Sequence, residues 1–117
     1  MHDANLLTYS SSLETDAQAW ADSLAASCGG LVHEEGTGQG ENLASCSGFP
    51  SAPVTCSSGF AATPRWYDEI EFYSLDPTTG SGVSTRDGVD IGHFTQVVWK
   101  GSTELGCASS ACSFFSG

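Results

Sequence analysis

Apolar residues recur at steps of three and four along residues 11–27, as they do on one face of an amphipathic helix. This stripe is made of Leu13, Ala17, Trp20, Ala21 and Leu24. Ser11 and Glu14 have the spacing of a capping box, in which the two side chains satisfy free N–H groups at a helix start. Gly29 and Gly30 favour a helix end at which a residue adopts the left-handed backbone conformation. The pattern therefore predicts a helix over residues 11–27.

A second helix is predicted over residues 64–73. Thr63 is suited to cap it, and Pro64 to begin it, because a first helical residue needs no hydrogen-bonded N–H. One face of this helix then carries the apolar side chains of Trp66, Ile70 and Tyr73.

The remaining stretches have weaker patterns. Residues 36–62 are rich in glycine, serine and other small residues, and the part from Ala44 to Gly59 is predicted as a loop. Residues 76–92, with Pro77 and four glycines, are predicted as another loop. Residues 93–100 fit a helix by their apolar spacing but a strand by their β-branched content, so periodicity leaves both open. Residues 105–115 are predicted as short strand segments around two cysteines.

Charge narrows the range of partners. The chain of 117 residues carries 14 acidic and three basic residues, a net charge of −11. Three isolated cations cannot neutralise a row of phosphates, so nucleic-acid binding is disfavoured. Electrostatic docking on an anionic membrane is disfavoured for the same reason. The length fits a single domain over residues 1–117.

Cysteine usage indicates the compartment. Five cysteines in a short Gly- and Ser-rich chain, none in a CxxC pair, indicate disulfides and a secreted protein. The odd count leaves one thiol free, paired between chains, or separated from its partner. No apolar run approaches the ~20 residues that span a bilayer, and residues 1–5 lack the features of a secretory signal. The chain is therefore expected to be a mature form or a fragment.

Four motifs stand in order along the chain: LVH at residues 31–33, GENL at 40–43, RWYDEI at 65–70, and GHFTQVVWK at 92–100, closed by LGC at 105–107. With these motifs, from about residue 6 to residue 112, the chain resembles the CAP superfamily. This superfamily contains the cysteine-rich secretory proteins, antigen 5 and the pathogenesis-related 1 proteins.

The resemblance implies an α+β fold, an α-β-α sandwich with a central, mostly antiparallel sheet between helices. It also favours a short helix at residues 93–100. The family's first helix would precede residue 6, and its last signature strand would follow Cys112. We therefore expect a single, incomplete CAP domain that is less stable than the family norm.

The resemblance also implies a pairing of cysteines. Cys28 would pair with Cys112, and Cys107 with a cysteine of the missing last strand, which leaves Cys107 unpaired here. Cys46 and Cys56 are close in sequence and can close the loop between them.

The same resemblance places His33, Glu41, Glu69 and His93 in a central cleft. Imidazole nitrogens are zinc ligands, and a carboxylate can orient an imidazole through its second nitrogen. We expect His33 and His93 to bind Zn²⁺ or another divalent metal, in a site with open coordination positions. Asn42 is predicted to be structural, with a side chain that satisfies loop backbone.

Enzymatic alternatives depend on the two cleft glutamates. Glu41 and Glu69 are candidates for a general acid–base pair, which with a metal would make a metal-dependent hydrolase. A zinc protease of the HExxH type would need histidine at position 37, where Thr37 stands. No nucleophilic serine or cysteine lies in a matched motif, so a non-enzymatic protein is favoured. A truncated, inactive copy is a further alternative.

Some branches of the family resemble lipid carriers. By that resemblance a sterol or fatty acid would bind near the aromatic stretch at residues 72–77, unless these aromatics simply pack inward where the helix ends. A protein partner is the other expectation. The sequence as a whole predicts a secreted CAP protein with a role in defence or secretion.

Overall fold

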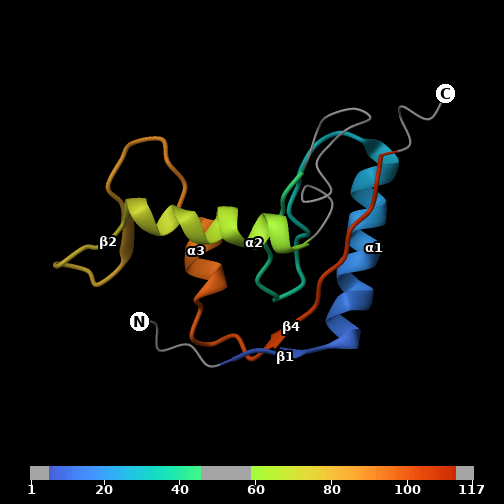
Figure 1. Ribbon diagram of the computed structural model, residues 1–117, viewed down its shortest axis with the longest axis horizontal. Helices are drawn as coiled ribbons and strands as arrows, with labels where there is room; N and C mark the ends of the chain where they lie inside the picture. The colour runs from blue at the N-terminus through green and yellow to red at the C-terminus, as the bar shows by residue number, and fades with distance from the viewer. Residues whose placement is uncertain (1–5, 46–58, 113–117) are drawn as a thin grey trace.

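A computed structural model describes residues 6–45 and 59–112 of the chain (Figure 1). In chain order, its elements are β1 (Thr8–Tyr9), α1 (Ser11–Ser27), α2 (Gly59–Tyr67), the 3₁₀ helix η2 (Asp68–Phe72), β2 (Tyr73–Leu75), β3 (Gly82–Ser84), α3 (Gly92–Val97) and β4 (Glu104–Leu105). This mixture of helices and short strands confirms the α+β prediction.

The helix α1 has the predicted bounds, but both of its ends differ from the expected ones. Ser10, not Ser11, is the cap: its backbone is extended, and its hydroxyl accepts from the N–H of Leu13. At the other end Cys28, not a glycine, takes the left-handed conformation with φ 49°. Its N–H donates to the carbonyl of Leu24 at 3.0 Å, which closes the last turn.

The apolar stripe of α1 is half-buried along its whole length. The start of the helix packs against β4, which pairs in parallel with β1. A side chain at Gly106 would collide with the backbone between Leu13 and Glu14, so only glycine allows this close approach. The hydroxyl of Tyr9 donates to Glu14, and this hydrogen bond raises the pKa of Tyr9.

The chain after β4 runs back along α1 (Figure 1). Gln18 donates to the carbonyl of Ser109 at 2.9 Å, and a disulfide joins Cys28 to Cys112. This is the pairing that the resemblance implied. Within the described ranges Cys107 is an exposed free cysteine. Cys46 and Cys56 lie outside the described residues.

The second helix begins earlier than predicted. It starts at Gly59, so Pro64 lies inside it rather than at its first position. Proline has no backbone N–H to donate. The helix nevertheless continues past Pro64 to Tyr67, where the 3₁₀ helix η2 follows and ends at Phe72. The predicted cap at Thr63 was therefore wrong.

The predicted loop at residues 76–92 contains a strand that was missed. Residues 82–84 form β3, which pairs antiparallel with β2. Asp76 holds the connecting turn, because its carboxylate accepts from the N–H groups of Thr78 and Thr79. Gly80 allows the turn to close with φ 71°. Short strands joined by a Gly- and Thr-rich turn give too little periodic signal to be found from sequence.

The helix α3 confirms the helical prediction for its segment. Its residue Phe94 is 2% exposed, and the rings of Tyr67 and Tyr73 meet it edge-on. Among the described residues only Phe94 and Ala62 count as buried apolar residues. The core is therefore small and is centred on the contact between α2, η2 and α3.

The strands of the described residues form two separate two-stranded sheets, β1–β4 and β2–β3. The single central sheet that the resemblance implied is not seen in this part of the chain. The sandwich arrangement and the truncation at both ends therefore stay predictions.

We predict that the contribution of the Asp76 turn to stability depends on pH. Hydrogen bonds from the backbone of Thr78 and then Thr79 lower the pKa of Asp76 below its ordinary 3.8. A depressed folded-state pKa gives stability that is present above the unfolded value and is lost as the pH falls through the folded one. We expect the Asp76 carboxyl ¹³C signal to titrate below 3.8 in the folded protein and near 3.8 in urea. Equal midpoints would contradict the capped turn.

Candidate functional site

Two histidine–glutamate pairs are the main polar feature of the molecule. The first joins His33 and Glu41, both on the segment that follows α1. The Nδ1 of His33 lies 2.5 Å from Oε1 of Glu41. The same oxygen accepts from the backbone N–H of Glu34 at 3.2 Å. This pair is the more exposed one, with 65% of the His33 side chain accessible.

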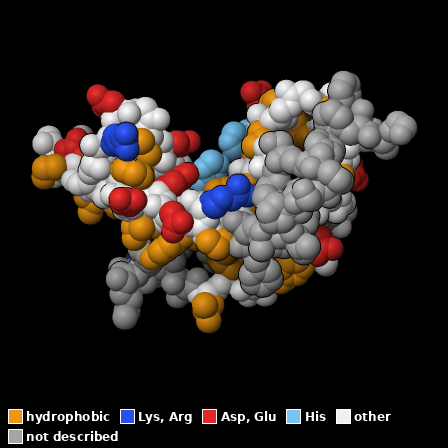
Figure 2. All heavy atoms as spheres, turned by 45° about the horizontal axis from the view of Figure 1, so that its top comes forward, with side chains coloured by type: hydrophobic (Ala, Val, Ile, Leu, Met, Phe, Trp, Pro, Cys, Tyr) orange, Lys and Arg blue, Asp and Glu red, His pale blue; other side chains and the backbone are white. Residues whose placement is uncertain are grey.

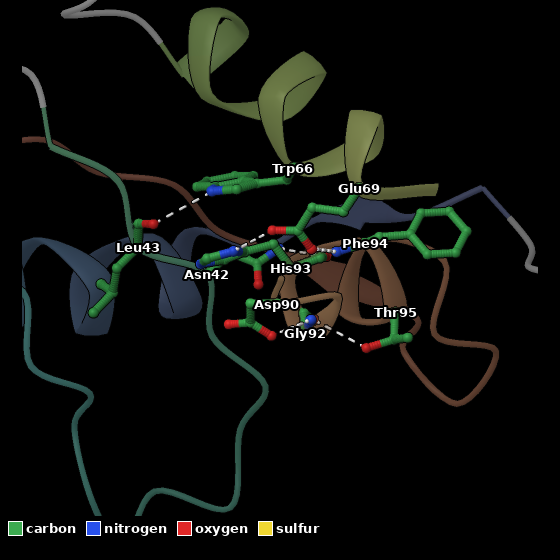
Figure 3. A network of polar contacts seen from close by, with 9 residues as sticks. All are labelled: Asn42, Leu43, Trp66, Glu69, Asp90, Gly92, His93, Phe94 and Thr95. Atoms are coloured by element: carbon green, nitrogen blue, oxygen red, sulfur yellow. Dashed lines mark hydrogen bonds and ion pairs between the residues drawn. The ribbon is translucent and has the colours of Figure 1, made fainter. Parts of the chain in front are cut away.

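The second pair joins η2 to α3 (Figure 3). Oε1 of Glu69 lies 2.7 Å from Nδ1 of His93, and its Oε2 accepts from the N–H of Phe94 at 2.9 Å. Glu69 therefore binds the ring of one residue and the backbone of the next. Its side chain is 17% exposed, and that of His93 is 30% exposed.

The start of α3 explains why this second pair forms. The first N–H groups of a helix have no partner within the helix. Asp90 accepts from the N–H of Gly92 at 2.8 Å, and Glu69 accepts from that of Phe94. Negative charge at this end also suits the helix dipole. His93 lies between these two capped positions, so its ring is held next to Glu69.

Each glutamate determines which ring nitrogen is free. An ionised carboxylate can only accept a hydrogen bond, so in the neutral form of each histidine Nδ1 carries the proton. In that tautomer Nε2 is the unprotonated nitrogen with a free lone pair. This is the arrangement in which a histidine binds a metal while a carboxylate orients its ring.

Neighbouring groups enclose the second pair. The indole of Trp66 stacks on the His93 ring with centroids 6.0 Å apart, and its Nε1 donates to the carbonyl of Leu43 at 3.3 Å. Asn42 donates to the backbone carbonyl of His93 at 3.1 Å. Asn42 thus satisfies a backbone carbonyl, but this carbonyl lies on α3 and not in a loop as predicted. The only sequence signal for this contact was its position next to Glu41.

The two pairs lie near each other on the surface. Figure 2 shows the described histidine side chains gathered in a hollow, with acidic side chains nearby. All four residues assigned to the cleft thus form hydrogen-bonded pairs. Across residues 6–45 and 59–112, however, no group of three or more His, Cys, Asp or Glu side chains is arranged to hold a metal ion.

A separate cavity of about 600 Å³ lies on the other side of Phe94. It is lined by apolar side chains of η2, β2 and α3 and by Trp99, which is 58% exposed. Its polar lining includes Ser81, Thr95 and Lys100. The aromatic stretch at residues 72–77, proposed from sequence as a lipid site, contributes Tyr73 to this wall.

Comparison with known proteins identifies the family. The model of the CAP, or cysteine-rich secretory protein, family matches residues 1–117. The chain belongs to the CAP family. The two histidine–glutamate pairs, and the GHFTQVVWK motif whose first six residues form α3, thus lie within the region that matches the family.

Individual CAP relatives come from fungi and plants. The chain is 40% identical to Protein PRY2 of Saccharomyces cerevisiae over 94% of its length, and 39% identical to Pathogenesis-related protein 1A of Nicotiana tabacum over 91%. It is 36% identical to Secreted protein RBT4 of Candida albicans over 95%. It spans 28%, 55% and 26% of these relatives, respectively.

No helix of this CAP chain, within the residues that the structure describes, is both long and apolar enough to cross a membrane.

Because Glu69 binds Nδ1 of His93, we predict that replacing the Glu69 carboxylate changes the tautomer of His93. In Glu69→Gln the amide oxygen can still accept from Phe94, but the amide nitrogen donates and so cannot accept from Nδ1. We expect His93 to shift from the Nδ1–H toward the Nε2–H tautomer in ¹⁵N imidazole spectra. The matched control is Glu71→Gln on the same 3₁₀ helix. An unchanged His93 tautomer in Glu69→Gln would show that Glu69 does not orient the ring.

Proposed function

We propose that this CAP chain acts outside the cell and binds a divalent metal ion, zinc-like in its ligand preference, through His33 and His93. The observation that carries the proposal is the pairing of each Nδ1 with a glutamate. This pairing leaves both Nε2 atoms as the ligands.

The donor set fits such an ion. Imidazole nitrogen is a preferred ligand of Zn²⁺, and a hydrogen-bonded carboxylate raises the basicity of the ring. Two protein ligands leave coordination positions for water or another ligand, which indicates an exchangeable ion and not a structural one. When bound, the ion would supply Lewis acidity to whatever fills those positions. The net charge of −11 adds a general attraction for cations.

An extracellular setting is supported by two observations. The Cys28–Cys112 disulfide is of a kind that persists in oxidising compartments. One relative is named a secreted protein, and others are named pathogenesis-related proteins. We infer from these names a secreted, defence-related role. The chain covers only part of the length of these relatives. The role of the whole proteins is therefore extended to this chain only as a proposal.

Zinc titration tests the metal site. We expect the wild-type chain to bind Zn²⁺ in calorimetry and the double variant His33→Ala, His93→Ala to lose binding. Each single variant should weaken binding by at least the roughly 10- to 100-fold typical of a lost outer-shell partner. The matched control is His2→Ala, which replaces the third histidine of the chain. Equal affinity in the wild type and the double variant would refute the proposal.

Lipid binding is a second candidate function, and the cavity beside Phe94 favours it. Its volume of about 600 Å³ lies within the range of small-molecule sites. Ile70, Val98 and Trp99 offer apolar surface to a sterol ring or an acyl chain. Lys100 at the same wall would complement the carboxylate of a fatty acid.

Titration with a fluorescent sterol and a fluorescent fatty acid tests this candidate. Trp99→Ala should weaken binding of both by roughly tenfold or more, because burial of a large apolar side chain contributes about 1.5–3 kcal/mol. Lys100→Gln should weaken binding of the fatty acid alone. Leu105→Ala, which removes an exposed apolar side chain on β4, is the control. Binding that none of these variants changes would exclude this cavity as the lipid site.

A further inference from the structure

The two histidine–glutamate pairs come from distant parts of the chain. His33 and Glu41 lie on the segment after α1, whereas Glu69 and His93 lie on η2 and α3. Neither pair contains a bond to the other. A metal ion that binds both imidazoles requires a fixed distance between them. A contact outside the two pairs must therefore fix this distance.

Asn42 makes a contact of this kind. It follows Glu41 in the chain, and its Nδ2 donates to the backbone carbonyl of His93 at 3.1 Å. In Figure 3 its side chain lies next to His93. The Asn42 side chain thus links the two pairs. Asn42 follows Glu41 of the first pair in the sequence, and its side chain binds the backbone of His93 in the second pair.

Two flanking contacts hold the segment around Asn42 in place. Before it, a side chain at Gly40 would overlap the amide of Gln96 on α3. After it, the carbonyl of Leu43 accepts from Trp66 on α2. Both contacts position the backbone. Neither is a hydrogen bond to a histidine, whereas Asn42 bonds directly to the backbone of His93.

We propose that Asn42 is a positioning residue: it holds His93 at a set distance from the His33–Glu41 pair, so that both imidazoles bind one metal ion. The inference rests on the metal site proposed above. Ligands must be held to within about 0.5 Å of a productive geometry. Loss of an outer-shell partner typically lowers metal affinity by about 10- to 100-fold.

The deciding variant is Asn42→Asp. It has nearly the same shape, but it replaces the N–H donor with an oxygen that repels the His93 carbonyl. It also adds a negative charge beside the site, which alone would tighten cation binding. Positioning and simple electrostatics therefore predict opposite results. We expect Zn²⁺ affinity to fall by about 10- to 100-fold in calorimetry.

Three further variants separate positioning from folding and charge. Asn42→Gln keeps an amide donor and should recover part of the affinity. Asn42→Ala removes the donor without adding charge and should resemble Asn42→Asp. Ser23→Asp adds the same charge at an exposed position on α1 and should not weaken binding. Amide spectra of each metal-free variant verify that it is folded.

The outcomes distinguish this inference from the function on which it rests. If Asn42→Asp binds Zn²⁺ as tightly as the wild type, while the double histidine variant does not bind, the inference is wrong and the metal site stands. If the double histidine variant binds like the wild type, the metal site fails. Metal-free ¹⁵N imidazole spectra then decide: the inference requires Asn42→Asp to shift the His93 ring signals, and unshifted signals overturn it.

Discussion

The carboxylate of Glu69 is the contact on which the rest of the site depends. One oxygen holds the His93 ring and the other caps the helix at Phe94. A single side chain therefore holds His93, a proposed metal ligand, and the start of the helix that carries it. Because Phe94 is the most deeply buried side chain of the described residues, the same bond also ties the site to the small core.

That core is small for a chain of this length, which changes what holds the fold. Few side chains are buried in the described ranges, so hydrophobic burial has less area over which to act. Specific contacts take a larger share: the disulfide across 84 residues of sequence, the bond from Gln18 to Ser109, and the close approach at Gly106. A cross-link over so long a loop restricts the unfolded chain most strongly.

The helix α3 separates two different chemical environments. His93 faces the polar network with Glu69 and Asn42, whereas Phe94, Thr95 and Val98 border the cavity of about 600 Å³. The short helix and the residue that follows it thus place His93 in a polar network and contribute Phe94, Thr95 and Val98 to the cavity lining. A ligand in the cavity would contact the helix whose start carries His93. The two candidate functions therefore share one structural element without sharing a binding surface.

The sequence by itself determined the parts that depend on local periodicity and on ordered motifs. It gave the bounds of α1 through its apolar stripe and the family through four motifs. It also singled out the histidines and glutamates that the structure joins in two pairs, while their role in a cleft stays a prediction. It failed at Ser10, Cys28 and Pro64, because caps and helix starts depend on small energies that neighbouring contacts override. It also missed β3, whose three residues carry no period of their own.

Only the tertiary structure decided how the cleft residues are joined. No spacing along the chain reveals that Glu69 binds two groups at the start of α3, or that Asn42 reaches a carbonyl 51 residues away. Such bonds form between segments that folding brings together, and a residue's type states only that it can donate or accept. The sequence thus specified the donors and acceptors, and the packing of η2 and the segment after α1 around α3 selected their partners.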